Sequence, residues 1–290
     1  MSKRLIVTHK APDLDAITAT WLLKQFDTQH YGDAKIEFVS AGEKLDDNKI
    51  EELSISKDKI VYVDTGLGEF DHHQDDRGKQ RLSASSLVLD HICKIHPEKK
   101  DDEALNFLVD FVTGIDHFEE IYWPESDSER YSFMLHELIH GLEHLEYHDD
   151  DSKLHFGFTC LDSVYGTLKS HFIARKIIAD RAKKFFIKDL KCLSISSNND
   201  DTVKIAQKMG YAVVLRKDPD EGHIRVKARP DADINLEALY EKVRNTDTEG
   251  SWYFHPSGKM LLNGSGKNKH AASPLTLEQM INLLKEIYEK

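Results

Sequence analysis

Cysteine is scarce in this sequence. The three cysteines, Cys93, Cys160 and Cys192, are far apart along 290 residues. An odd number at these spacings excludes a disulfide framework and a CxxC metal knuckle. Because free cysteine is among the residue types most often found in protein interiors, we expect three buried thiols.

Long apolar runs are also missing. The first residues, MSKRLIVTHKAPDLD, reach charged side chains within a few positions and contain neither the apolar core nor the cleavage site of a signal peptide. No other stretch approaches the roughly 20 apolar residues that span a bilayer. The sequence therefore predicts a cytoplasmic protein with no membrane partner.

Basic residues are outnumbered by acidic ones. The 39 lysines and arginines against 51 aspartates and glutamates give a formal net charge of -12. Such a chain repels a long polyanion unless a local basic groove compensates, so we expect no long duplex DNA as a partner. Small anions remain compatible, because bound cations can invert the local field.

Strand-like and helical patterns alternate in the first part of the chain. Apolar runs at residues 4–8, 36–40 and 59–64 are separated by helical patterns such as residues 15–26. This alternation predicts an α/β domain with a parallel sheet and crossover helices. Further helical patterns follow at residues 84–95, 102–113, 130–147 and 161–188.

A second α/β unit is predicted after the last of these helices. At 290 residues, the chain is long enough for two domains. We place the boundary at residue 190, so that residues 1–189 include a connecting helix at 161–188 and residues 190–290 form the smaller domain. Its predicted strands are 192–196, 212–216 and 223–228, and its predicted helices are 202–209, 236–243 and 275–288.

Acidic and histidine side chains follow the predicted strands. His9, Asp13 and Asp15 lie on the loop and first helical turn after the first strand, and Asp64 ends the third. Parallel sheets place their chemistry at the carboxyl ends of the strands, so these side chains are expected to converge. Because the apolar run IVYV before Asp64 indicates a buried strand, an uncompensated charge there would be costly, and a metal ion is the simplest compensation.

The ligand types restrict the choice of metal. Imidazoles and carboxylates without a thiolate favour Mn²⁺, Mg²⁺, Fe²⁺ or Co²⁺ over a structural zinc site. We expect two divalent ions, with Mn²⁺ as the first choice and Mg²⁺ or Co²⁺ as alternatives. Two ions roughly 3.5 to 4 Å apart activate water and neutralise the charge of a phosphoryl group, which is the chemistry of phosphoester or phosphoanhydride hydrolysis.

Four motifs, in order, resemble those of the DHH phosphoesterase superfamily. HKAPDLDA is similar to its HxxxDxDA first motif, VDTG to its second, DHHQ to its third and GIDHF to its fourth. The short gap between Asp64 and Asp71, and the Gln after DHH, resemble the MYG1-like branch, whereas the DxD of the first motif departs from that branch.

The resemblance implies a metal-binding catalytic domain with one bridging carboxylate. Asp64 would bridge both ions. His9 and Asp13 would hold one ion, and Asp15, His72 and Asp116 would hold the second. The six implied ligands are Asp64, His9, Asp13, Asp15, His72 and Asp116.

Two further residues of the third motif are implied to act in catalysis. His73 would face the substrate phosphate, and Asp71 would orient an imidazole. Asp116 is preferred to the nearby Asp110 as the ligand of the fourth motif, because GIDHF follows a helical pattern, as expected of a loop residue, whereas Asp110 falls within that pattern.

The second domain resembles the DHHA1 domain. HIRVKARPDADINLEALYEKV, followed by LNGSGKNKHAAS, is similar to the strand that ends near an arginine and to the glycine-rich segment of that domain, although extra residues precede the histidine here. Exposed backbone N–H groups and lysines on such a loop can hold a phosphate. The implied substrate-binding residues are Arg229, Gly264, Ser265, Gly266, Lys267 and His270.

These resemblances imply a phosphodiesterase that acts on short oligonucleotides or nucleotide phosphodiesters, with exonuclease-type binding of nucleic acid. A pyrophosphatase or exopolyphosphatase is the alternative, because two-metal chemistry does not distinguish these substrates. A nucleotide-binding protein without hydrolysis is an alternative from another class. The expected partner is therefore a small phosphorylated molecule or a short oligonucleotide, and the sequence leaves a homodimer open.

A competing metal motif lies between the fourth of these motifs, GIDHF, and the second domain. Residues 136–140, HELIH, match HExxH, in which two imidazoles on one helix face hold zinc and the glutamate acts as general base of a peptidase. Apolar residues at helical spacing in the same segment are typical of an amphipathic structural helix. An intermediate interpretation places His136 or His140 in the phosphoester cleft.

Overall fold

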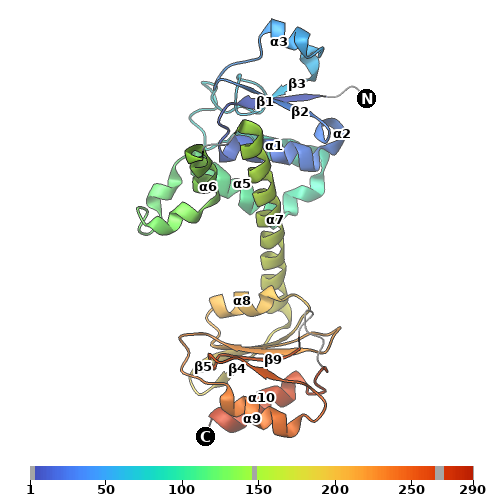
Figure 1. Cartoon of the computed structure of the whole chain (residues 1–290), viewed down its shortest axis with the longest axis vertical. Helices are drawn as coiled ribbons and strands as arrows, with labels where there is room; N and C mark the ends of the chain where they lie inside the picture. The colour runs from blue at the N-terminus through green and yellow to red at the C-terminus, as the bar shows by residue number, and fades with distance from the viewer. Residues whose placement is uncertain (1–3, 146–148, 265–270, 290) are drawn as a thin grey trace. The chain divides into compact units, whose positions relative to one another are not determined.

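The chain divides into two units, Met1–Leu168 and Lys169–Lys290. The computed structural model describes residues 4–145, 149–264 and 271–289 (Figure 1). Each unit combines helices with a sheet of its own, so both belong to the predicted α/β class. None of the described helices is both long enough and apolar enough to cross a membrane.

The first unit begins with strands that alternate with helices and continues with helices. Its strands and α-helices are β1 (Leu5–His9), α1 (Leu14–Phe26), α2 (Thr28–Tyr31), β2 (Lys35–Val39), α3 (Asp47–Glu52), β3 (Ile60–Tyr62), α4 (Ala84–Ile95), α5 (Glu103–Asp116) and α6 (Leu135–Gly141). Its 3₁₀ helices are Lys57–Lys59, Pro97–Asp101, Glu119–Tyr122, Glu129–Phe133 and Leu142–His144.

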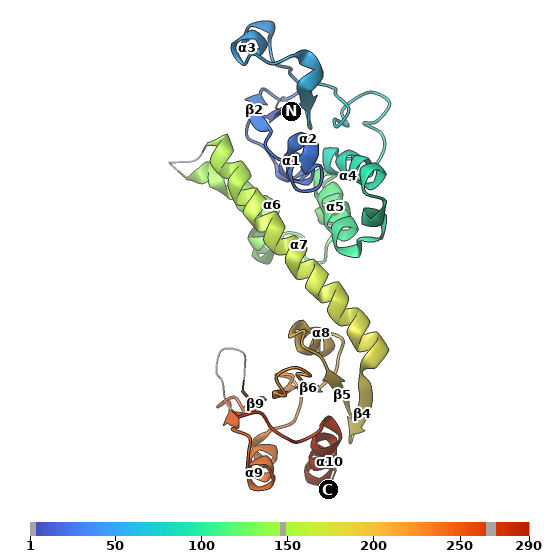
Figure 2. The same ribbon diagram turned by 90° about the vertical axis from the view of Figure 1, so that its right-hand side faces the viewer.

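The sheet of this unit is parallel, with the order β2-β1-β3. Successive side chains of a strand point to opposite faces, and β1 follows this rule. Ile6 belongs to the core that also contains residues of α1, α4 and α5, whereas Leu5 and Val7 pack with Val39 on the other side. Figure 2 shows α4 and α5 beside α1.

Helix α1 is buried along most of its length. All ten residues from Leu14 to Leu23 are buried, because the helix packs against β1, α4 and α5. Trp21 also makes a hydrogen bond to α7 (Asp150–Arg181), because its indole N–H donates to the Asp162 carboxylate at 2.8 Å. This packing fixes the loop before α1, which carries the predicted ligands.

The second unit has a sheet with the order β4-β5-β6-β7-β9-β8, in which β5 and β6 are parallel and the other neighbours are antiparallel. Helix α8 covers one face, and α9 and α10 cover the other (Figure 1). The elements are β4 (Lys183–Ile187), β5 (Leu190–Ser196), α8 (Asp201–Lys208), β6 (Val213–Lys217), β7 (Ile224–Ala228), α9 (Glu237–Thr246), β8 (Tyr253–Phe254), β9 (Met260–Asn263) and α10 (Leu277–Tyr288).

The connecting helix differs from the prediction. The sequence pattern placed it at residues 161–188, but α7 begins earlier, at Asp150, and ends earlier, at Arg181, where β4 follows. The segment KKFFI buries Phe185 and Ile187 at alternate positions and pairs with β5, so strand periodicity decides its structure. The units divide at Leu168 rather than at residue 190, because the second half of α7 contributes Ala174 and Ile178 to a core with β5 and α8.

Two further expectations are corrected. The helix predicted at 130–147 is interrupted, because Met134 is extended (φ -74°, ψ 153°) between a 3₁₀ helix and α6; residues 146 and 147 lie outside the described part of the chain. Of the three free cysteines, Cys192 is buried, whereas Cys93 and Cys160 are half-buried, so the expectation of three buried thiols is wrong for two.

Candidate metal centre

The predicted ligands of the first unit meet at the carboxyl end of its parallel sheet. His9 is the last residue of β1, and Asp64 follows β3 by two residues. The Asp64 backbone has φ +56°, a left-handed conformation that aspartate tolerates better than most residues do. Its N–H donates to the carbonyl of Phe70 at 2.9 Å. This turn directs a buried carboxylate to the sheet edge.

The first motif supplies two carboxylates at the start of α1. Asp13 is the N-cap, and its side chain accepts from the Ala16 N–H at 3.0 Å. Asp15 is buried, and its two oxygens accept from the Ala84 N–H at 2.6 Å and from the Ser85 N–H at 2.9 Å. Asp15 therefore also caps α4, whose amino terminus attracts negative charge.

The third motif turns one histidine inward and one outward. The His72 side chain is 10% exposed and the His73 side chain is 62% exposed. The Asp71 carboxylate is buried and accepts from the Leu67 N–H at 2.7 Å, the His73 N–H at 3.1 Å and the His73 Nδ1–H at 2.8 Å. Asp71 thus fixes the orientation of the His73 ring.

Asp64 stands between two imidazoles. Its Oδ2 lies 3.4 Å from His9 Nε2, and its Oδ1 lies 3.3 Å from His72 Nε2. His9 Nε2 is 4.0 Å from Asp13 Oδ1, and His72 Nε2 is 3.6 Å from Asp116 Oδ2. One carboxylate with a separate group of ligands at each oxygen is the arrangement expected of a bridging ligand.

The hydrogen bonds of these residues leave lone pairs directed at one another. His9 Nδ1 lies 2.9 Å from the Lys10 carbonyl, which can only accept, so Nδ1 carries the proton and the Nε2 of a neutral ring is bare. Asp64 Oδ1 and His72 Nε2 are buried and have no hydrogen-bond partner among the residues that the structure describes. Buried acceptors that face each other need a proton or a cation between them.

The excess of negative charge at this site also shifts the pKa values of the histidines and aspartates. Burial alone would lower the pKa of His9 and of His72, but the carboxylates of Asp64 and its neighbours raise both to about 9. Burial alone would raise the pKa of Asp64, but the two imidazoles hold it below its usual range. Burial, together with Asp64, raises the pKa of Asp116 to about 6 and that of Asp15 well above its usual range. Bound cations would replace the protons that this cluster retains.

Among the described residues, three overlapping groups of side chains could each hold a cation. Within each group, the ligand atoms lie within 4.8 Å of one another. The groups are His9, Asp13 and Asp64; Asp64, His72 and His73; and His72, Asp116 and His117. The donor set of oxygen and imidazole nitrogen fits divalent cations such as Mn²⁺ or Mg²⁺. Asp15 belongs to none of these groups, and its assignment as a ligand remains a prediction.

His117 was not identified from the sequence. Its Nε2 lies 2.9 Å from the Leu82 carbonyl, so Nε2 donates and Nδ1 of the neutral ring is left as a possible ligand atom. The only signal was its position directly after Asp116. Asp116 was expected on a loop, but it is the last residue of α5, and His117 is the C-cap. Asp110 pairs with Arg81 at 2.7 Å on the exposed face of the same helix.

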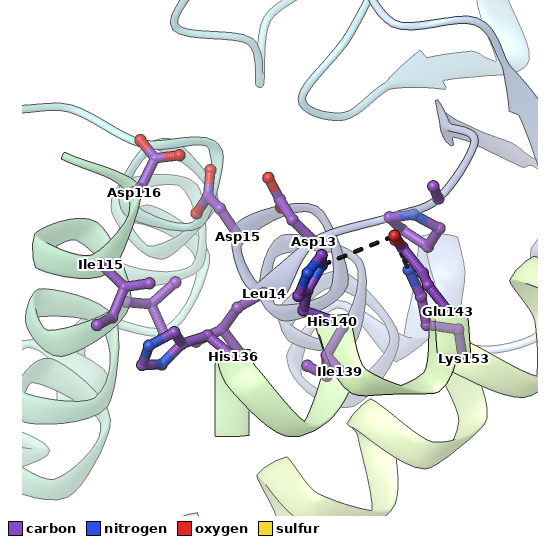
Figure 3. A pocket seen from close by; sticks show the side chains of 13 residues that line it. Asp13, Leu14, Asp15, Ile115, Asp116, His136, Ile139, His140, Glu143 and Lys153 are labelled. Atoms are coloured by element: carbon purple, nitrogen blue, oxygen red, sulfur yellow. Dashed lines mark hydrogen bonds and ion pairs between the residues drawn. The ribbon is translucent and has the colours of Figure 1, made fainter. Parts of the chain in front are cut away.

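A cavity of about 230 Å³ adjoins these carboxylates. Figure 3 shows Asp13, Asp15 and Asp116 close to residues of α6 and α7. Its polar lining residues are Asp13, Asp15, Asp116, His136, His140, Glu143 and Lys153.

The HExxH segment contributes to this cavity and not to a metal group of its own. Helix α6 carries both His136 and His140, but neither belongs to any of the metal-capable groups found in the described ranges. The described residues therefore give the zinc-peptidase interpretation no support, and both histidines line the cavity beside Asp13, Asp15 and Asp116.

The second unit holds Arg229 and Gly264, the two predicted substrate residues that the structure describes, apart from each other. Arg229 follows the carboxyl end of β7, whereas Gly264 lies at the opposite end of that strand, because Asn263 pairs with Ile224. Five strand residues separate the two ends by roughly 17 Å. Arg229 instead binds Asp231, with Nε to Oδ1 at 2.9 Å. The other predicted residues, Ser265, Gly266, Lys267 and His270, lie outside the described residues.

Comparison with known proteins gives matches among solved structures alone. No protein family and no curated protein matches the sequence. An uncharacterized protein from Helicobacter pylori is 13% identical, with a TM-score of 0.25, over 98% of this chain and 99% of its own. RecJ from Thermus thermophilus with Mn²⁺ is 11% identical, with a TM-score of 0.33, over 98% of this chain and 52% of its own, so this chain spans about half of RecJ. An exopolyphosphatase-related protein from Bacteroides fragilis is 15% identical, with a TM-score of 0.29, over 99% of this chain and 92% of its own.

Proposed function

We propose that this protein is a phosphohydrolase that depends on two divalent cations, with Mn²⁺ as the first choice. The observation that carries the proposal is the buried Asp64 carboxylate, which faces one group of ligands with each oxygen. An acid in such surroundings is costly to retain for structure alone.

The residues divide into two sets around Asp64. His9 and Asp13 would hold one cation, and His72 and Asp116 the other, with His117 as an added ligand. When bound, two cations neutralise the charge of a phosphoryl group and lower the pKa of water. Asp15 is hydrogen-bonded to the start of α4 through both oxygens, and its predicted role as a ligand of the second cation would use their other lone pairs.

His73 is the side chain best placed to act on substrate. It is exposed, its Nδ1 is held by Asp71, and that nitrogen lies 3.8 Å from Asp64 Oδ1. Because Asp71 fixes Nδ1, the other ring nitrogen is available to a phosphoryl oxygen or to the leaving oxygen.

Replacing Asp71 by asparagine is expected to lower kcat by roughly 10–100-fold, the loss typical of residues that orient a ligand or a catalytic group. An asparagine amide presents one acceptor atom, whereas Asp71 accepts with both oxygens, from Leu67 and from His73. Steady-state kinetics with metal content measured in parallel checks this. A variant with normal kcat would contradict the role of Asp71 in positioning His73.

The substrate class is proposed as phosphodiesters of short oligonucleotides or nucleotides, with pyrophosphate or polyphosphate as the second candidate. Hydrolysis of bis-p-nitrophenyl phosphate, pApA, pyrophosphate and polyphosphate with added Mn²⁺ tests this choice. Turnover of the dinucleotide or the aryl diester supports the first class, and release of phosphate from the last two alone supports the second. Inactivity on all four would remove the proposal.

A further inference from the structure

A buried lysine lies beside the candidate metal centre. Lys153, near the start of α7, is 2% exposed, and its Nζ lies 2.7 Å from Glu143 Oε1. Lysine is almost never fully buried unless it is paired. The Glu143 side chain is 38% exposed, and its Oε2 lies 3.7 Å from Nδ1 of the exposed His140 side chain. This acid can therefore turn toward solvent, whereas the lysine cannot.

The fold holds Lys153 in this position. Gly157, one helical turn further along α7, lies so close to α1 that a Cβ there would stand 2.5 Å from Ile17 Cγ2. Residues four apart share a helix face, so the contact at Gly157 brings the face that carries Lys153 toward the start of α1. The Ala11 N–H also donates to Asp150 Oδ1 at 2.8 Å, which ties the first turn of α7 to the loop before α1.

The cavity has two chemically different sides. Besides apolar residues, one side carries carboxylates from the start of α1 and the end of α5. The other carries two histidines of α6, Glu143 of the 3₁₀ helix Leu142–His144 and Lys153 of α7 (Figure 3). His136 Nδ1, on the second side, is buried and has no hydrogen-bond partner among the described residues. At about 230 Å³, the cavity is smaller than the roughly 300–1,000 Å³ of pockets for drug-sized ligands, so it suits a small polar group.

The charge of the cavity depends on the cations. Four acids and one lysine line it, an arrangement that repels anions by itself. Divalent cations on Asp13 and Asp116 would reverse that sign on one side, while Lys153 already supplies a positive charge on the other.

We propose that this cavity is an anion subsite in which Lys153 binds a phosphoryl group adjacent to the one that is hydrolysed. The inference rests on the proposed function and narrows it to substrates that carry a second phosphoryl group. The incoming anion replaces Glu143 as the partner of Lys153, and His136 and His140 supply further hydrogen bonds.

Titration calorimetry of the metal-loaded protein with inorganic phosphate tests the subsite without turnover. Lys153→Met is expected to weaken phosphate binding by about tenfold or more, as for loss of a charge-assisted hydrogen bond. Glu143→Gln keeps the lysine, removes its competitor and is expected to bind phosphate more tightly than the wild type. Lys99→Met is the matched control. Lys99 Nζ lies 3.2 Å from Asp102 Oδ2 and does not line the cavity, so this variant is expected to bind phosphate as tightly as the wild type.

Each alternative outcome has a definite meaning. Equal phosphate affinity in wild type and Lys153→Met overturns the subsite, as does a wild type that binds no phosphate at millimolar concentration. If Lys153→Met does not fold, Glu143→Gln decides, because a purely structural ion pair predicts no gain in phosphate affinity. Lysine-dependent phosphate binding in a protein that hydrolyses none of the four test substrates would keep the subsite and remove the proposed function alone.

Discussion

Replacing Asp64 by alanine is expected to abolish hydrolysis and to reduce the bound divalent metal. Both groups of ligands lose their shared carboxylate, and His9 and His72 lose the acid that faces them. The fall in kcat should exceed the roughly 100-fold upper limit for residues that only orient a ligand. Metal analysis of the dialysed variant and assays on the active substrate provide the measurements.

Asp110→Ala is the matched control for this variant. Asp110 is also an aspartate of the first unit, but it pairs with Arg81 on an exposed face of α5. Exposed ion pairs contribute about 0–1 kcal/mol, so activity and metal content should stay at wild-type levels. An Asp64→Ala protein that retained activity would remove the metal centre as the site of hydrolysis.

In the metal-free protein, stability is expected to fall as pH rises from neutral to just above 9. The pKa of His9 and of His72 in the folded protein is about 9, above the ordinary value of 6.5. Folding therefore favours the protonated rings, and this contribution is fully present below about pH 6.5 and is lost as pH rises through about 9. One pKa unit corresponds to about 1.4 kcal/mol, so a loss of a few kcal/mol is expected, equivalent to roughly 5–10 °C in Tm.

Thermal unfolding after chelation, followed across this pH range, measures the effect. Bound cations occupy the same nitrogen atoms without their protons, so the metal-loaded protein should show a smaller fall, and the Tm gain from metal should increase with pH. Asp64→Asn should flatten the metal-free curve, because it removes the carboxylate that raises both pKa values. A metal-free Tm that stayed constant or increased with pH would contradict this account.

The parts predicted well from sequence depend on short-range patterns. The parallel sheet and α1 follow from apolar runs that alternate with helical spacing, and the strands that carry His9 and Asp64 end at one edge for topological reasons. The His73 ring donates a hydrogen bond to Asp71, its neighbour by two positions in the same motif, and the orienting role of Asp71 stays a prediction. Local patterns decide the elements, and the rule for parallel sheets decides which strand ends meet.

The parts that sequence could not give depend on long-range packing. Arg229 and Gly264 are at opposite ends of β7 because of an antiparallel register that no local pattern reveals. Lys153 is far in sequence from Asp13, and it reaches the cavity because Gly157 allows α7 to approach α1. A lysine in the first turns of a charged helix looks like a solvated residue until that contact is known.

The capping of α4 by Asp15 gives the protein an internal reporter of its own chemistry. The backbone N–H groups of Ala84 and Ser85 donate to the Asp15 carboxylate, whose pKa is raised by burial and by the nearby charges of Asp64 and Asp116. Any change of charge among those acids alters the polarisation of these two N–H bonds. The chemical shifts of these two backbone amides, on a helix that carries none of the predicted ligands, should therefore change when divalent cations are added.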